Sequence, residues 1–132
     1  MSKKEKLLSI IIPVFNEEST IGNIIDRVKA AADQTGLRKE VIVVDDCSHD
    51  SSLERAVGHG ARLYALKMHL GKGYALRAGF AKARGEIVVT IDSDGSHRPE
   101  ELSELLSPIL KNQADLVLDQ DTLTTRKFMP DD

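Results

Sequence analysis

The stretch Gly85–Pro99, which reads GEIVVTIDSDGSHRP, decides how the rest of the chain is interpreted. Its first part, Glu86–Ile91, is a short apolar run rich in β-branched residues, which predicts a buried strand. Two carboxylates, Asp92 and Asp94, follow at the end of this strand, just before Gly95. Carboxylate oxygens suit a hard divalent cation such as Mg²⁺ or Mn²⁺, and these ions often hold substrate phosphates. Ligands of an open parallel sheet bind at the carboxyl ends of its strands, so position and chemistry agree.

Composition places the chain among globular single domains. Its 132 residues are 41% hydrophobic and 30% charged, which is enough for one core and a charged surface. A net charge of −3 and an aromatic content of 4% argue against a nucleic-acid partner. The single cysteine, Cys47, excludes an internal disulfide and favours a reducing compartment, so we expect a cytoplasmic location. No apolar run reaches the roughly 18 residues of a membrane span, and Met1–Lys6 does not open a signal peptide.

Strand and helix patterns alternate along the whole chain. Besides Glu86–Ile91, apolar runs predict strands at Leu7–Ile12, Val41–Val44, Ala61–Leu66 and Asp115–Leu118. Between them, helical spacing predicts helices that begin near Thr20, Ser51, Tyr74 and Pro99. This alternation predicts an α/β fold with right-handed crossovers and a mainly parallel, Rossmann-like sheet with helices on both faces. Residues 1–118 are assigned to this domain, and 119–132 is interpreted as a polar tail without regular structure.

Two further motifs allow more than one interpretation. Asp45 and Asp46 form a second carboxylate pair at a strand end, as in the acidic pocket of a response-regulator receiver. That class needs an aspartate at the end of the third strand, and Ala61–Leu66 has none. Gly71-Lys72-Gly73 resembles a phosphate loop but lacks the GxxxxGK[ST] pattern, so it is either a helix-entry turn or a nucleotide contact.

Four segments, in this order and spacing, carry a family resemblance: Ile11–Glu18 (IIPVFNEE), Val43–Asp50 (VVDDCSHD), Gly71–Gly79 (GKGYALRAG) and Asp92–Glu100 (DSDGSHRPE). Together they resemble the nucleotide-sugar-binding half of family-2 glycosyltransferases, which have the GT-A fold. Within this family, the chain resembles dolichyl-phosphate mannosyltransferase-like enzymes and their polyprenyl-phosphate relatives. The resemblance covers roughly Leu7 to Leu118. It implies an alternative for residues 119–132, namely the truncated start of an acceptor-binding half that follows the Asp92–Asp94 region.

The resemblance implies an inverting, metal-dependent transfer of a sugar from a GDP- or UDP-linked donor to a polyprenyl phosphate or a glycan. It implies that Asp92 and Asp94 are the DxD pair that holds Mg²⁺ or Mn²⁺ on the diphosphate. A metal there would neutralise the charge that develops on the departing nucleotide. The residues that the resemblance assigns to donor nucleotide binding are Pro13, Phe15, Glu17, Val44, Asp45, Asp46, Lys72, Gly73 and Ser93.

The sequence departs from the family pattern at several positions. Cys47 stands where a small residue, often glycine, is usual, and cysteine fits poorly if the backbone there needs a positive φ. Asp119-Gln120-Asp121 stands where relatives commonly have Gly-x-Arg. The half that carries the acceptor site and the general base is missing, so no catalytic residue is assigned. The alternative function is therefore a non-catalytic nucleotide-sugar-binding or interaction module.

Other partners and residues are interpreted more simply. Apolar surface left by a missing half predicts self-association, a partner chain or contact with a membrane face. A sugar nucleotidyltransferase would need a glycine-rich basic loop, which Pro13–Thr20 does not provide. His49, His59 and His69 have no ligand spacing and are interpreted as surface residues. For His97 and Arg98, contact with phosphate or acceptor and a solvated loop both remain open.

Overall fold

The computed structural model describes residues 6–96, 98–111, 116–119 and 122–126. In chain order the elements are β1 (Leu7–Val14), α1 (Ile21–Gln34), β2 (Arg38–Asp45), α2 (Ser52–Ala56), β3 (Arg62–Ala65), α3 (Lys72–Lys82), β4 (Ile87–Thr90), the 3₁₀ helix η2 (Pro99–Glu101), α4 (Leu102–Leu110), β5 (Leu116–Asp119) and β6 (Thr122–Arg126). The strands form one sheet in the order β3-β2-β1-β4-β6-β5. Among the described residues, no helix is long and apolar enough to cross a membrane.

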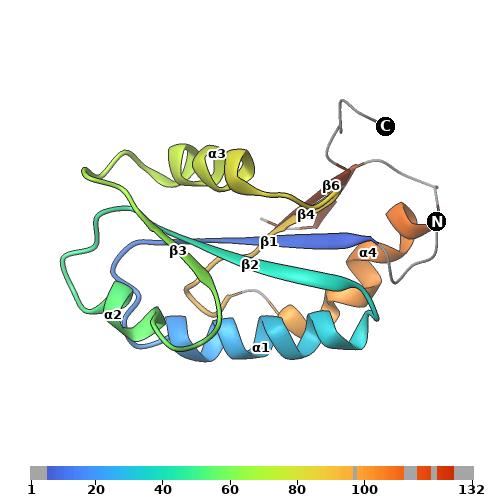
Figure 1. Ribbon diagram of the computed structural model, residues 1–132, viewed down its shortest axis with the longest axis horizontal. Helices are drawn as coiled ribbons and strands as arrows, with labels where there is room; N and C mark the ends of the chain where they lie inside the picture. Colours follow the sequence, from blue (N-terminus) through green and yellow to red (C-terminus); the bar gives the residue numbers. More distant parts are fainter. Residues whose placement is uncertain (1–5, 97, 112–115, 120–121, 127–132) are drawn as a thin grey trace.

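The predicted α/β fold with helices on both faces of the sheet is confirmed. Strands β3, β2, β1 and β4 run parallel to one another, whereas β6 is antiparallel to both β4 and β5. In Figure 1, α1, α2 and α4 lie on one side of the sheet and α3 lies on the other. This arrangement requires every central strand to be apolar on both faces, which explains the uninterrupted apolar runs in the sequence.

The expectation of a polar tail without regular structure after Leu118 is wrong for Thr122–Arg126, which forms β6. This strand lies between β4 and β5 in the sheet. Its sequence, TLTTR, contains β-branched threonines that favour extended backbone, but too few apolar residues to show a strand pattern. Pairing with a strand on each side overrides the weak local signal, so the sheet extends at least to Arg126. Gln120, Asp121 and residues 127–132 lie outside the described residues.

The core consists of two apolar layers that share β1. Every residue of β1 from Leu8 to Val14 is buried. Ile10 and Ile12 belong to the layer beneath α1 and α4, whereas Ile11 packs with Val44 in the layer beneath α3. Successive side chains of a strand point to opposite faces of the sheet, so β1 contributes to both layers.

Gly79 allows α3 to lie close to the sheet. A Cβ atom built on this residue would lie 2.5 Å from Ile11 Cγ2 and 3.3 Å from Val44 Cγ2. Such a contact is far inside van der Waals distance, so any side chain here would push the helix away from β1. In the same helix, a Cβ on Gly73 would meet nothing within 4 Å.

Glu40 connects four segments through its carboxylate. Its Oε2 accepts hydrogen bonds from Ser9 Oγ on β1 and from the Arg84 backbone N–H, each 2.6 Å long. Its Oε1 lies 2.6 Å from Arg62 Nη1 on β3. Burial alone would raise the pKa of Glu40, but these hydrogen bonds and the Arg62 charge outweigh it and lower the pKa below 4.5. The charged form therefore stabilises the fold.

We expect Gly79→Ala to lower the free energy of unfolding by about 1–3 kcal/mol, because the added methyl group overpacks the contact with Ile11. Gly73→Ala is the matched control in the same helix. It should raise the free energy of unfolding by up to about 1 kcal/mol, because alanine has a higher helix propensity than glycine. Urea unfolding of the three proteins measures both effects. Equal changes of the same sign would contradict the close packing of α3 on β1.

We expect Glu40→Gln to destabilise the protein by about 1–3 kcal/mol at pH 7, because charge-assisted hydrogen bonds become neutral ones. A lowered carboxyl pKa contributes stability above the unfolded value and loses it as the pH falls through the folded value. The difference between wild type and variant should therefore be complete above about pH 5 and should shrink in stronger acid. Unfolding curves at several pH values test this, and a difference independent of pH would contradict it.

Candidate functional site

The carboxyl ends of β1, β2 and β4 meet at one edge of the sheet, where backbone hydrogen bonds continue the pairing beyond the strands. The Asp46 N–H donates to the Val14 carbonyl at 2.8 Å, and the Ile91 N–H donates to the Ile11 carbonyl at 2.9 Å. The loops that follow these strands therefore begin side by side, as the parallel topology predicted.

An open pocket lies at this edge, and it is lined by Pro13, Val14, Phe15, Glu17, Asp46, Lys72, Ala75, Asp92, Ser93 and Asp94. Most of the residues predicted to contact the donor, and both predicted metal ligands, are in this set. They come from four separate segments of the chain, which the fold brings together. Val14 and Ala75 were not predicted, because apolar residues of a strand and a helix carry no chemical signal of their own.

Three predicted donor residues do not line the pocket. Val44 is fully buried beneath α3. Asp45 accepts hydrogen bonds from the N–H and the Oγ of Ser48, at 3.1 and 2.6 Å, and so shapes the loop after β2. Gly73 lies exposed in the first turn of α3. Their positions favour structural roles for Val44 and Asp45, and their predicted contacts with a nucleotide stay predictions.

Several acidic side chains line the pocket. Burial, followed by the charge of Asp94, raises the pKa of Glu17. Asp94 Oδ1 accepts hydrogen bonds from the N–H and the Oγ of Ser96, which hold its carboxylate in place. Lys72 Nζ lies 2.7 Å from Asp92 Oδ1 and supplies a neighbouring positive charge. The pocket thus presents several acidic oxygens next to one lysine.

These side chains fit a cation whose coordination is completed by a bound ligand. Within the described part of the chain, no cluster of three or more His, Cys, Asp or Glu side chains could hold a metal ion unaided. Mg²⁺ commonly binds through one or two carboxylates together with substrate phosphates and water, rather than in an all-protein cage. Asp92 and Asp94, at the rim of an open pocket, match that requirement.

Two non-glycine residues in the loops around the pocket have a positive φ. Asn16 has φ 55° and Cys47 has φ 60°. Asparagine tolerates this region, and Asn16 Oδ1 also accepts the His49 N–H at 2.8 Å. Cysteine tolerates this region less well than asparagine does, and its observed φ shows that this position takes the positive φ that the family resemblance raised. Holding Cys47 there costs on the order of 1–2 kcal/mol.

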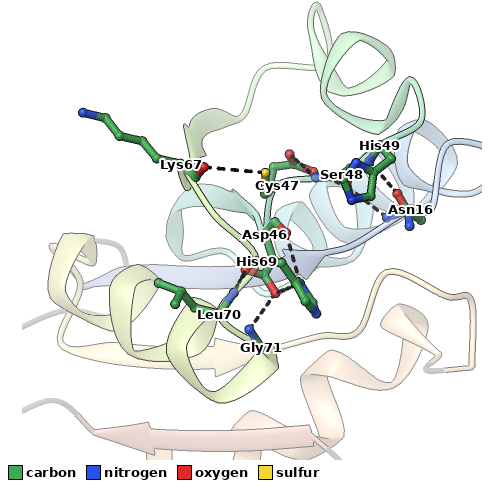
Figure 2. Close-up of polar contacts among 10 residues, drawn as sticks. Asn16, Asp46, Cys47, Ser48, His49, Lys67, His69, Leu70 and Gly71 are labelled. Atoms are coloured by element: carbon green, nitrogen blue, oxygen red, sulfur yellow. Dashed lines mark hydrogen bonds and ion pairs between the residues drawn. The ribbon is translucent and has the colours of Figure 1, made fainter.

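Asp46 binds the backbone of the loop before α3, as Figure 2 shows. Its Oδ1 accepts the Leu70 N–H at 2.8 Å, and its Oδ2 accepts the Gly71 N–H at 2.9 Å. His69 Nδ1 lies 2.7 Å from the same Oδ2. The His69 ring in turn stacks on Phe15, with 4.1 Å between ring centroids.

His69 is the residue that sequence reasoning missed. Its side chain is 52% exposed, which agrees with a surface position, yet it contacts two residues of the pocket. Asp46 lies 23 positions away in the chain, so no short-range spacing could indicate the pair. His59 instead binds Asp26 on α1, and Arg98 pairs with its neighbour Glu101. His97 lies outside the described residues.

Comparison with known proteins identifies the class. The model of the family "Glycosyl transferase family 2" matches residues 9–124, so the chain belongs to this family. The undecaprenyl-phosphate 4-deoxy-4-formamido-L-arabinose transferase of Aeromonas hydrophila is 39% identical over 112 residues, which cover 80% of this chain and 34% of that protein. The dodecaprenyl-phosphate galacturonate synthase of Rhizobium johnstonii is 33% identical over 117 residues, which cover 84% of this chain and 35% of that protein.

Solved structures show the same fold. Glucosyl-3-phosphoglycerate synthase from Mycobacterium tuberculosis, in complex with Mn²⁺, UDP and glucosyl-3-phosphoglycerate, superposes with a TM-score of 0.69 at 36% identity. The match covers 80% of this chain and 40% of that one. The expected GT-A fold is therefore confirmed. The chain spans about a third of the length of the curated relatives it matches.

Proposed function

We propose that the pocket binds a nucleoside-diphosphate sugar together with Mg²⁺ or Mn²⁺. The observation that carries this proposal is the convergence of Phe15, Asp46, Lys72, Asp92 and Asp94 on one pocket at the carboxyl edge of the sheet. Ligands of parallel α/β folds bind at this edge. A similar structure that contains Mn²⁺ and UDP supports the proposal for this chain.

Each group in the pocket has a distinct role in the proposed complex. Asp92 and Asp94 hold the cation, which neutralises charge on the departing nucleoside diphosphate when it is bound. Lys72 provides a second positive charge at the start of α3, within reach of the same phosphates. Phe15 offers an aromatic surface to the base, and the apolar floor formed by Val14 and Ala75 excludes water beneath the donor.

The proposed reaction is an inverting transfer of the sugar to a polyprenyl phosphate or a glycan. The names of two relatives contain undecaprenyl phosphate and dodecaprenyl phosphate, which supports a lipid phosphate as the acceptor. No described residue is assigned as the general base, so the proposal concerns donor binding first. Metal-dependent nucleotide binding without transfer to any acceptor would favour the alternative, a non-catalytic binding module.

Replacing either metal ligand tests the proposal. We expect Asp92→Asn or Asp94→Asn to weaken Mn²⁺-dependent binding of UDP or GDP at least about tenfold, because a neutral amide replaces a charged ligand. Calorimetric titration of the full chain with each nucleotide, with Mn²⁺ and then with a chelator, measures the loss. Asp33→Asn, an exposed change at the end of α1, is the control. Unchanged affinity in both pocket variants would rule out this metal site.

Lys72 should compete with a cation that binds without nucleotide, because its amine already pairs with Asp92 at 2.7 Å. We expect Lys72→Met to bind Mn²⁺ alone about two- to fivefold more tightly, since an exposed ion pair is worth up to about 1 kcal/mol. The same variant should bind UDP with Mn²⁺ more weakly, because it lacks the charge that faces the phosphates.

Paramagnetic relaxation of water protons reports Mn²⁺ binding in both experiments. Lys82→Met, at the other end of α3, removes an exposed lysine whose amine lies 5.2 Å from the Tyr64 ring centroid and serves as the matched control. Identical Mn²⁺ affinities for the two lysine variants would contradict the competition.

A further inference from the structure

The turn after β4, residues 92–96, carries the second carboxylate of the pocket beyond the end of the sheet; we call it the aspartate turn. Backbone pairing with β1 continues to Ile91, whose N–H donates to the Ile11 carbonyl at 2.9 Å, so Asp92 follows a fixed residue. Asp94 is two positions further along and is exposed. Its hydrogen bonds with Ser96 lie within the same turn. The position of the turn relative to the sheet therefore depends on contacts with other elements.

Thr20, the N-cap of α1, supplies such a contact. Its Oγ1 lies 2.6 Å from the carbonyl oxygen of Ser93, the residue between the two pocket aspartates, although the two residues are 73 positions apart. A carbonyl oxygen can only accept, so the hydroxyl is the donor. The Glu17 carbonyl oxygen and Oε2 are each 3.4 Å from the same hydroxyl, so Ser93 is its main acceptor. Because Ser93 is 5% exposed, this bond joins α1 to the buried centre of the aspartate turn.

This use of the Thr20 hydroxyl differs from the usual role of an N-cap residue. An N-cap threonine ordinarily accepts a hydrogen bond from a backbone N–H in the first helical turn, which stabilises its helix. The Thr20 side chain makes no such bond. Its backbone carbonyl still accepts the Ile24 N–H at 2.9 Å, so the helix begins here without help from the side chain. The hydroxyl thus stabilises the aspartate turn rather than its own helix.

A second contact joins α1 to the chain that follows the aspartate turn. Arg27 Nε and Nη2 donate to the two carboxylate oxygens of Glu100 at 2.9 and 2.7 Å. Thr20 and Arg27 lie about two helical turns apart on one face of α1, and their partners Ser93 and Glu100 have the same spacing in the sequence. The helix therefore lies alongside the chain after β4 and contacts it on both sides of Gly95 (Figure 1).

We propose that Thr20 is a positioning residue for the cation of the proposed complex, because its hydroxyl holds Ser93 and thereby sets the placement of the Asp92 and Asp94 carboxylates. This inference rests on the proposed function, since it concerns the same metal ion. Thr20 is outside the set of residues that line the pocket, so it acts through Ser93. Mg²⁺ demands near-ideal octahedral geometry, whereas Ca²⁺ accepts flexible coordination. Loss of the hydroxyl should therefore weaken Mg²⁺ binding more than Ca²⁺ binding.

The test uses Thr20→Val, which keeps the shape of the side chain and removes the donor. Relaxation of water protons measures Mn²⁺ binding to the full chain with UDP or GDP, and competition with Mn²⁺ measures Mg²⁺ and Ca²⁺ binding. Thr20→Val should bind Mn²⁺ and Mg²⁺ about three- to tenfold more weakly, as expected for one lost hydrogen bond. Its Ca²⁺ affinity should fall at most about twofold. Thr20→Ser keeps the hydroxyl and should restore the wild-type affinities to within about twofold.

Thr35 provides the matched control at the other end of α1. Its Oγ1 donates to the Ala32 carbonyl at 2.6 Å, the same length as the bond of Thr20, and also accepts the Leu37 N–H at 3.2 Å. In urea unfolding of the metal-free protein, Thr35→Val should therefore destabilise the fold at least as much as Thr20→Val. Its affinities for Mn²⁺, Mg²⁺ and Ca²⁺ should stay at the wild-type values. Equal losses of affinity in the two variants would show a general loosening of the fold and would overturn the positioning role.

The outcomes separate this inference from the function on which it rests. A wild type that binds Mn²⁺ with a nucleotide, together with a Thr20→Val variant of the same affinities, would overturn the role of Thr20 and leave the metal site intact. Equal losses for Mg²⁺ and Ca²⁺ would overturn that role as well. If Thr20→Val does not fold, the comparison of Thr20→Ser with Thr20→Ala decides, and equal Mg²⁺ affinities in these two would overturn it. A folded wild type that binds no Mn²⁺ with either nucleotide would overturn the proposed function itself, and this inference with it.

Discussion

The parallel pairing of β1 with β2 on one side and β4 on the other is the constraint on which the rest of the structure depends. Because β1 is buried from Leu8 to Val14, neither neighbour can shift by one residue without moving polar side chains into a core layer. The register in turn decides where the three strands end. The loops that leave those ends are thereby brought to one edge, where the pocket forms.

Hydrogen bonds that backbone N–H groups donate to carboxylates convert this shared edge into a defined site. Asp45 holds Ser48, Asp46 holds Leu70 and Gly71, and Asp50 Oδ1 accepts the Ser52 N–H at 2.9 Å. An acidic residue near a strand end is thus not automatically a ligand. The carboxylate of Asp45 accepts its hydrogen bonds within its own loop, whereas Asp92 and Asp94 line the pocket. The local sequence around each of these residues does not reveal that difference.

Much of the fold could be predicted because each central strand is buried on both faces and therefore reads as an uninterrupted apolar run. The position of Asp92 and Asp94 in the pocket could be predicted for a related reason, since they interrupt such a run at its carboxyl end. Strand β6 could not, because its stability comes from two neighbouring strands rather than from its own threonines. His69 could not either, since its partners Phe15 and Asp46 meet it only after three loops converge.

If the pocket has the proposed function, its charges also affect how the metal ion and the nucleotide influence each other's binding. A diphosphate that arrived alone would meet the carboxylates of Asp92 and Asp94, and like charges at short range repel. A cation that arrived alone would have to displace the amine of Lys72 from Asp92. With both bound, Asp92 and Asp94 would hold the cation, and the amine of Lys72 would face the phosphates. Each ligand therefore removes the obstacle to the other, and by linkage their affinities rise together.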